Sequence, residues 1–174
     1  MAIRSKELGE DHPGLANNLR NLAVVYQDKK NYAEARDLYK KAGEIFANQL
    51  GPDNAYTIDC LNQQAVMHTL LEEFSEAEKL LVTIAQSNKK MGDDSLPFAQ
   101  SLFRLAMVMS RQGKYKNAEP YFQKSLSIQR QKLGERNSVT QQTVAGYALL
   151  LERTNRSAEA KQLKAGMRSV GFDK

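Results

Sequence analysis

Disulfide bridges, membrane spans and cysteine-rich metal sites all need residues that this sequence lacks. Cys60 is the single cysteine, which excludes an internal disulfide and any zinc site built from several cysteines. No apolar run approaches the roughly 18 residues that cross a bilayer, and residues 1–6 lack the apolar stretch of a secretory signal. We therefore expect no membrane association and a reducing, cytoplasmic compartment.

Residues that break secondary structure are also scarce. Of the 174 residues, 41% are hydrophobic, which is enough for a core. The 4 prolines and 10 glycines are too few for a β-sandwich or a disordered chain. The net charge of +5, from 25 basic and 20 acidic residues, mildly favours acidic partners. The basic residues are scattered, however, and no run of five or more forms, which favours a solvated lysine-rich helical surface as their explanation.

Groups that could perform catalysis are isolated. His12 and His68 have no cysteine or carboxylate at ligand spacing, and Cys60 has no companion base. The acidic pairs at 72–73 and 93–94 are sequence neighbours, which cannot converge on one substrate. No glycine-rich phosphate loop is present. We expect no enzyme, no cofactor and no metal site.

The strongest pattern in the sequence is a repeat of about 42 residues. Alanines recur at intervals of 42, 41 and 42, and glycines recur at the same intervals, with 26 residues from each glycine to the next alanine. The positions are Ala35, Ala77, Ala118 and Ala160, and Gly9, Gly51, Gly92 and Gly134. The agreement between the alanine and glycine intervals indicates tandem structural units that bury their apolar faces against each other.

Each unit has the pattern of a helical hairpin. In the first unit, apolar residues spaced by three and four from Leu15 to Tyr26 mark one helix, and a polar run at 28–31 ends it. A second apolar stripe from Tyr32 to Phe46 marks another helix, which ends before Gly51 because glycine can adopt the left-handed conformation.

Small residues explain how the two helices of a hairpin approach each other. Ala23, Ala65, Ala106 and Ala148 occupy one equivalent position on the first helices. The alanine series from Ala35 to Ala160 occupies the facing position on the second helices, which lets helix axes approach to roughly 8–10 Å. The sequence therefore predicts an all-α, right-handed superhelical solenoid of about four antiparallel hairpins.

These residues resemble the tetratricopeptide repeat, which also pairs an apolar-Leu-Gly/Ala-Tyr helix with an Ala-aromatic helix. The first unit supplies Leu19, Leu22, Ala23, Tyr26, Ala35, Tyr39 and Ala42. A period near 42 in place of the usual 34 or so is similar to the kinesin-light-chain subtype. Departures are Gln64 and His68 in the second unit, and Ser157 and Lys164 in the fourth, whose polar second helix is expected to be an end cap.

We expect one array over residues 1–174, with repeats at 9–50, 51–91, 92–133 and 134–174. Residues 3–9 match residues 128–134, the end of a second helix. The expectation is that residues 1–8 are the tail of a preceding helix and the chain is the C-terminal piece of a longer array. A self-contained protein is the alternative.

In a solenoid of this kind, the first helix of each unit lines a concave groove. The side chains expected to face this groove are rich in amides, which pair with a peptide backbone, and in arginine, which pairs with carboxylates. The candidate binding residues are Asn17, Arg20, Asn21, Gln27, Asn62, Gln63, Phe103, Arg104, Met107 and Arg111, and the fourth unit adds Gln142, Ala145, Leu149 and Arg153.

The resemblance implies that Asn21 and Asn62 clamp a peptide backbone while Arg20 and Arg104 select acidic side chains. Phe103 and Met107 are expected to form an apolar pocket. The predicted function is a non-enzymatic adaptor that binds an extended, acidic peptide of a protein partner. The alternatives are a regulatory segment of a longer protein, self-association through an exposed array end and, remotely, RNA binding, which a lone groove aromatic at Phe103 disfavours.

Overall fold

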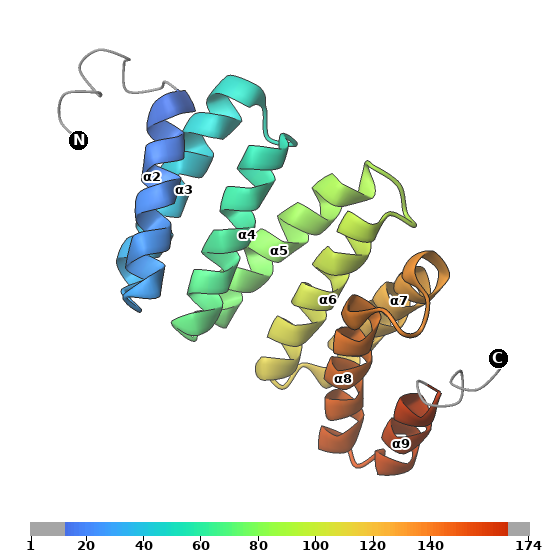
Figure 1. Cartoon of the computed structure of the whole chain (residues 1–174). Coiled ribbons are helices and arrows are strands. Elements are labelled where there is room, and N and C mark those ends of the chain that lie inside the picture. Colours follow the sequence, from blue (N-terminus) through green and yellow to red (C-terminus); the bar gives the residue numbers. More distant parts are fainter. Residues whose placement is uncertain (1–12, 167–174) are drawn as a thin grey trace. The chain divides into compact units, whose positions relative to one another are not determined.

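The computed structural model describes residues 13–166 and is helical throughout that range. Its helices are α2 (Pro13–Asp28), α3 (Tyr32–Leu50), α4 (Ala55–Leu70), α5 (Phe74–Lys89), α6 (Leu96–Arg111), α7 (Tyr115–Leu133), α8 (Ser138–Arg153) and α9 (Ser157–Ala165), as Figure 1 shows. The all-α hairpin architecture is thus confirmed. The expected helix tail at 1–8 lies outside the described residues. The chain divides into two compact units, unit 1 (residues 1–87) and unit 2 (residues 88–174).

The turn inside each hairpin is the same structure, repeated with the period of the sequence. Positive φ angles of 60–74° occur at Lys30, Glu72, Gly113 and Asn155, one in each hairpin. The amide that follows each of them donates to a carbonyl five residues earlier, as in Asn31 N–H to Tyr26 O at 2.9 Å. This pattern is the Schellman ending of a helix. The same four-fold repeat at 42, 41 and 42 residues therefore exists in the backbone, although only one of the four positions is glycine.

The connections between hairpins also repeat. Gly51, with φ of +97°, ends α3, and three residues later the side chain of Asn54 accepts a hydrogen bond from the Tyr56 amide at 2.9 Å. Asn137 caps α8 in the same way through the Val139 amide at 2.9 Å. Each N-cap satisfies a backbone donor that the helix itself leaves unpaired. The glycine therefore ends one hairpin and the residue three positions on starts the next.

The alanines lie in the core as the spacing predicts. Ala23, Ala65, Ala106, Ala148, Ala35, Ala77, Ala118 and Ala160 are all 2% exposed or less. Ala23 of α2 and Ala35 of α3 share one apolar cluster with Tyr39 and Met67. The absence of larger side chains at these positions allows the two helices of a hairpin to approach closely.

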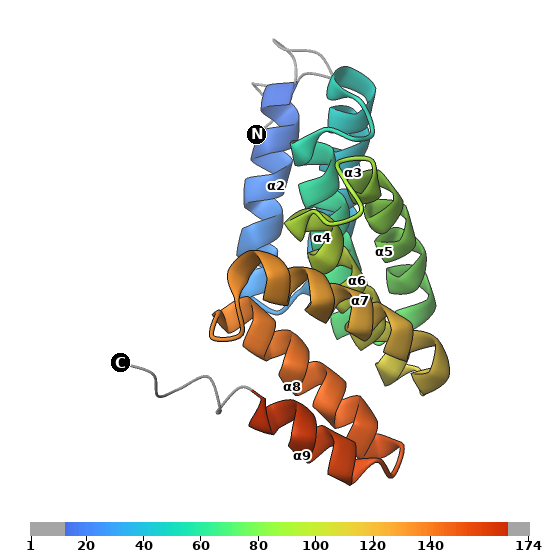
Figure 2. The same cartoon turned by 90° about the vertical axis from the view of Figure 1, so that its right-hand side faces the viewer.

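Packing within each unit joins successive helices. In unit 1, α3 packs against both α2 and α4. An added Cβ at Gly43 would lie 3.1 Å from Cys60 Cβ, so α3 and α4 also meet at small residues. In unit 2, α7 packs against α6 and α8, and α8 pairs with α9, as Figures 1 and 2 both show. Helix α9 is polar, with Lys161 exposed and Lys164 paired to Glu152 at 2.8 Å.

Candidate functional site

The first helix of each hairpin places its predicted binding residues on one face. At about 100° of rotation per residue, Asn17, Arg20 and Asn21 fall within about 100° of each other on α2. Asp59, Asn62 and Gln63 have the same spacing on α4. We call these faces of α2 and α4 the amide wall of unit 1. The wall combines exposed side chains (Asn17 and Asn21) with half-buried ones (Arg20, Asp59, Asn62 and Gln63).

An ion pair joins the two helices of the amide wall. Arg20 Nη1 donates to Asp59 Oδ2 at 3.2 Å, and the guanidinium lies 5.7 Å from the centre of the Tyr56 ring. The Tyr56 ring in turn stacks on Phe46, with 5.3 Å between centroids. Arg20 was expected to select acidic peptide side chains. In this structure its charge already faces a carboxylate of its own chain, so an acidic ligand would have to compete with Asp59.

Several amides of the wall use one of their groups internally. Asn62 Nδ2 donates to the Ile58 carbonyl at 3.0 Å, and Asn17 Nδ2 donates to the Pro13 carbonyl at 3.3 Å. Both bonds use the NH₂ group, so the carbonyl oxygens of these side chains are left as acceptors for a ligand N–H. Gln27 instead accepts a hydrogen bond from Tyr39 Oη at 3.1 Å and thereby ties α2 to α3. Asn21 is exposed on the same face.

The corresponding face of unit 2 is formed by α6 and α8, and we call it the arginine wall. It carries Arg104 and Arg111 on α6 and Arg153 on α8, and no acidic residue is among the positions that we assign to it. These positions are Gln100, Phe103, Arg104, Met107 and Arg111 on α6, and Gln142, Ala145, Gly146, Leu149 and Arg153 on α8. The two walls therefore differ in composition: the amide wall contains Asp59, which pairs with Arg20, whereas the named positions of the arginine wall include no acidic residue.

Phe103 and Met107 make the contact between α6 and α8. An added Cβ at Gly146 of α8 would lie 2.9 Å from Met107 Sδ and 3.3 Å from the Phe103 ring. Phe103 also meets the buried Phe122 ring edge to face, with 6.2 Å between centroids. The side chains of Phe103 and Met107 are both half-buried. The expected apolar pocket between them is therefore largely filled by the backbone of α8, and they offer a ligand an apolar surface rather than a deep pocket.

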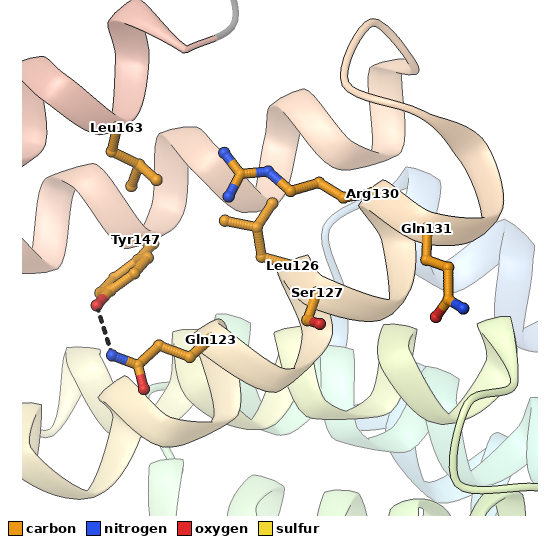
Figure 3. A pocket seen from close by; sticks show the side chains of 7 residues that line it. All are labelled: Gln123, Leu126, Ser127, Arg130, Gln131, Tyr147 and Leu163. Carbon is orange, nitrogen blue, oxygen red and sulfur yellow. Dashed lines mark hydrogen bonds between the residues drawn. The ribbon is translucent and has the colours of Figure 1, made fainter.

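Sequence reasoning did not find the cavity that lies between α7, α8 and α9, which Figure 3 shows. Its volume is about 620 Å³, and Gln123, Leu126, Ser127, Arg130, Gln131, Tyr147 and Leu163 line it. Gln123 Nε2 donates to Tyr147 Oη at 3.0 Å, and Tyr147 Oη donates to Glu119 at 2.7 Å. Burial, followed by the bond to Glu119, raises the pKa of Tyr147 above its usual range. The 42-residue period could not have located this cavity, because a cavity depends on how far several side chains extend from their helices.

The isolated reactive groups are held in structural roles. Cys60 is fully buried, and burial raises the pKa of its thiol to about 11. His68 Nδ1 lies 2.6 Å from Glu73 Oε2, and Arg36 donates to the same carboxylate at 3.1 Å. The hydrogen bond from His68, followed by that from Arg36, lowers the pKa of Glu73. Within residues 13–166 no three potential ligands gather to hold a metal ion, and no helix there has the length and apolarity to cross a membrane.

A sequence model described as the tetratricopeptide repeat matches residues 1–42, 16–83 and 97–164. The chain belongs to the tetratricopeptide repeat family. Proteins of this family are in general non-enzymatic scaffolds for protein–protein interaction, and protein partners are what the repeats indicate for this chain. A comparison with curated protein sequences found no match.

Solved structures of other repeat proteins share this fold. BtubC (BKLC) from P. vanneervenii has 18% sequence identity and a TM-score of 0.81, over 99% of this chain and 71% of that chain. A putative kinesin light chain with nearly identical TPR-like repeats from Podosopora anserina has 21% identity and a TM-score of 0.82, over 97% and 81%. The TPR domain of Sgt2 from Aspergillus fumigatus has 18% identity and a TM-score of 0.56, over 82% of this chain and 83% of that chain. The helical hairpins are thus similar to those of kinesin-light-chain-like repeats, as the period near 42 residues predicts.

Proposed function

We propose that the chain is an adaptor that binds an extended, acidic segment of another protein on the walls formed by its first helices. The observation that carries this proposal is the arginine wall of unit 2. Arg104, Arg111 and Arg153 lie on faces of α6 and α8 with no acidic residue among them. Guanidinium groups bind carboxylates through paired hydrogen bonds, so this wall favours aspartate and glutamate side chains.

The amide wall of unit 1, taken by itself, suits peptide backbone more than acidic side chains. Asn17, Asn21 and Asn62 each present an amide, and an extended backbone offers alternating N–H and C=O groups that amides can pair with. Because the Arg20–Asp59 pair balances the charge there, unit 1 favours backbone contacts over selection of acidic side chains. The exposed apolar side chain of Val24, 45% accessible, adds a surface for an apolar residue beside the amides.

A peptide array tests the proposal on the full chain. Wild type is compared with Asn21→Ala/Asn62→Ala and with Arg104→Ala/Arg111→Ala, and Lys40→Ala on α3 is the control for a lost exposed charge. We expect the arginine variant to lose the preference for acidic peptides and the asparagine variant to lose affinity for all of them. Equal retention of hits by wild type and both double variants would exclude the walls as the binding surface.

A further inference from the structure

Unit 2 carries a cleft on the side of α6 that faces away from the arginine wall. Phe98 and Leu102 of α6 and Pro120 and Tyr121 of α7 line it, and its volume is about 270 Å³. Phe98 and Met107 are nine residues apart on α6, so at about 100° per residue they point in opposite directions. The cleft is therefore a surface that a ligand of the wall does not reach.

The rim of this cleft is basic. Lys89 and Lys124 line it together with Asp93. Lys89 Nζ lies 3.8 Å from Asp93 Oδ1, at the long end of an ion pair between two exposed side chains. The neighbouring carboxylate of Asp94 already pairs with Lys132 at 2.6 Å. Two ammonium groups against one carboxylate leave the rim with a net positive charge.

Pro120 of α7 is a residue that the fold alone does not explain. It lies inside a helix that runs from Tyr115 to Leu133, where proline is unfavourable because it removes a helical hydrogen bond and its ring crowds the preceding turn. The equivalent residues of the other second helices are Asp37, Lys79 and Gln162, which all have an N–H to donate. A locally unfavourable residue is expected where function requires it. The ring of Pro120 adds apolar surface to the wall of the cleft.

The Figure 3 cavity, one repeat later, shares two lining positions with this cleft, and the cation at one of them is held differently. Arg130 and Leu163, both labelled in Figure 3, occupy the positions that Lys89 and Tyr121 occupy 41 or 42 residues earlier, and Glu135 follows the repeat glycine as Asp93 does. There the Arg130 guanidinium makes two hydrogen bonds of 2.7 Å to Glu135. The cation beside the Figure 3 cavity is thus fully engaged, whereas Lys89 is loosely paired.

We propose that the cleft of Phe98, Leu102, Pro120 and Tyr121 binds a short acidic segment of a partner protein through one large apolar side chain. A cavity of roughly 150 Å³ holds a benzene ring, so the volume of 270 Å³ accepts a phenylalanine or leucine side chain. Carboxylates on either side of that anchor meet Lys89 and Lys124. Burial of that side chain, set against two exposed lysines whose ion pairs contribute little, makes the apolar anchor the main source of affinity.

Binding is measured with a blocked peptide, Glu-Asp-Phe-Glu-Asp, by amide chemical shifts of the full chain. We expect shifts at Phe98, Tyr121 and Lys124, and no saturable shifts with a peptide that has alanine in place of the phenylalanine. Lys124→Glu is expected to weaken binding at least about fivefold, because it places a repulsive charge on the rim. Its matched control is Lys41→Glu, at the equivalent position of α3.

Pro120→Ala separates binding from folding. Restoring the helical N–H should raise the melting temperature of the chain, while loss of the proline ring should weaken binding of the peptide. Three results would each overturn the proposal: shifts confined to α2, α4 or the arginine wall; equal loss of affinity in Lys41→Glu and Lys124→Glu; or sedimentation showing that a second copy of the chain covers the cleft. Because the wall variants leave α7 unchanged, failure here and failure of the adaptor proposal are distinguishable.

Discussion

Arg20 of α2 and Asp59 of α4 form an ion pair of 3.2 Å although 39 residues separate them in the sequence. The pair bridges the first helices of two successive hairpins, and both side chains are only half-buried. An exposed pair of this kind contributes little to folding, typically about 0–1 kcal/mol. Its larger consequence is for recognition, because the Asp59 carboxylate already binds the Arg20 guanidinium that an acidic ligand would need.

Replacing Asp59 by asparagine should therefore strengthen binding of acidic peptides. The change removes the competing charge and keeps the side-chain shape, and a gain of about threefold corresponds to an ion pair of roughly 0.6 kcal/mol. Titration of a fluorescent acidic peptide at low salt measures the gain. Arg20→Ala/Asp59→Asn is the control, since it should not show the gain. An unchanged dissociation constant in Asp59→Asn would mean that Arg20 does not contact the ligand.

The hairpin turn at Lys30 offers a direct test of backbone strain. Lys30 has a φ of 61° without being glycine, whereas Gly113 occupies the same turn in the third hairpin. A non-glycine residue in the left-handed conformation costs roughly 1–2 kcal/mol of strain. Glycine avoids this strain but loses more backbone entropy on folding, so the net gain is smaller. Lys30→Gly should therefore raise the free energy of unfolding by up to about 1 kcal/mol. Urea denaturation measures it, and Gly113→Lys should give the opposite sign.

The close approach of α2 and α3 depends on Ala35. This residue is fully buried in one cluster with Ala23 and Tyr39. Ala35→Leu inserts a larger side chain into a filled contact and should destabilise the chain by about 1–3 kcal/mol. The matched control is Ala33→Leu, because Ala33 is exposed on the same helix. Equal melting temperatures for the two variants would contradict this helix contact.

The Cys60 thiol should be nearly inert in the folded chain. Its pKa of about 11, raised from an ordinary 9.0 by burial, lowers the thiolate fraction at neutral pH about a hundredfold. Alkylation by iodoacetamide at pH near 8 should accordingly be slow in buffer and fast in denaturant. Rapid modification of the native protein, measured by mass spectrometry, would show that α3 and α4 separate readily at Gly43.

The repeat period predicted much of this fold because backbone requirements recur with it. The buried alanines from Ala23 to Ala160 and the helix end before Gly51 both follow from spacing alone. Side-chain pairings such as Arg20 with Asp59 could not be predicted, because they depend on which rotamers meet across two helices. The cleft at Pro120 could not be predicted either, for a related reason. Periodicity assigns each residue to a face, and a cleft is a gap left by the lengths of several side chains.

Acid should weaken unit 2 through Glu119. Arg156 donates to its carboxylate at 2.7 Å and 2.8 Å, and Tyr147 Oη adds a bond of 2.7 Å. The Arg156 guanidinium, followed by the bond from Tyr147, holds the pKa of Glu119 below its usual 4.5. Because the folded pKa is the lower one, this stabilisation is present above the unfolded value and is lost as pH falls through the folded value.

Thermal unfolding of Glu119→Gln from neutral pH to pH near 3 measures this contribution. Near pH 7 the variant should melt about 2–4 °C below wild type, the shift that about 1 kcal/mol produces in a chain of this size. The gap should narrow as the pH falls below 4.5, where wild type loses the same ion pair. Glu44→Gln is the control, because Glu44 is exposed on α3 in unit 1. A gap that stays constant with pH would show that Glu119 acts through packing, and its charge would then have no part in holding α9 against α7.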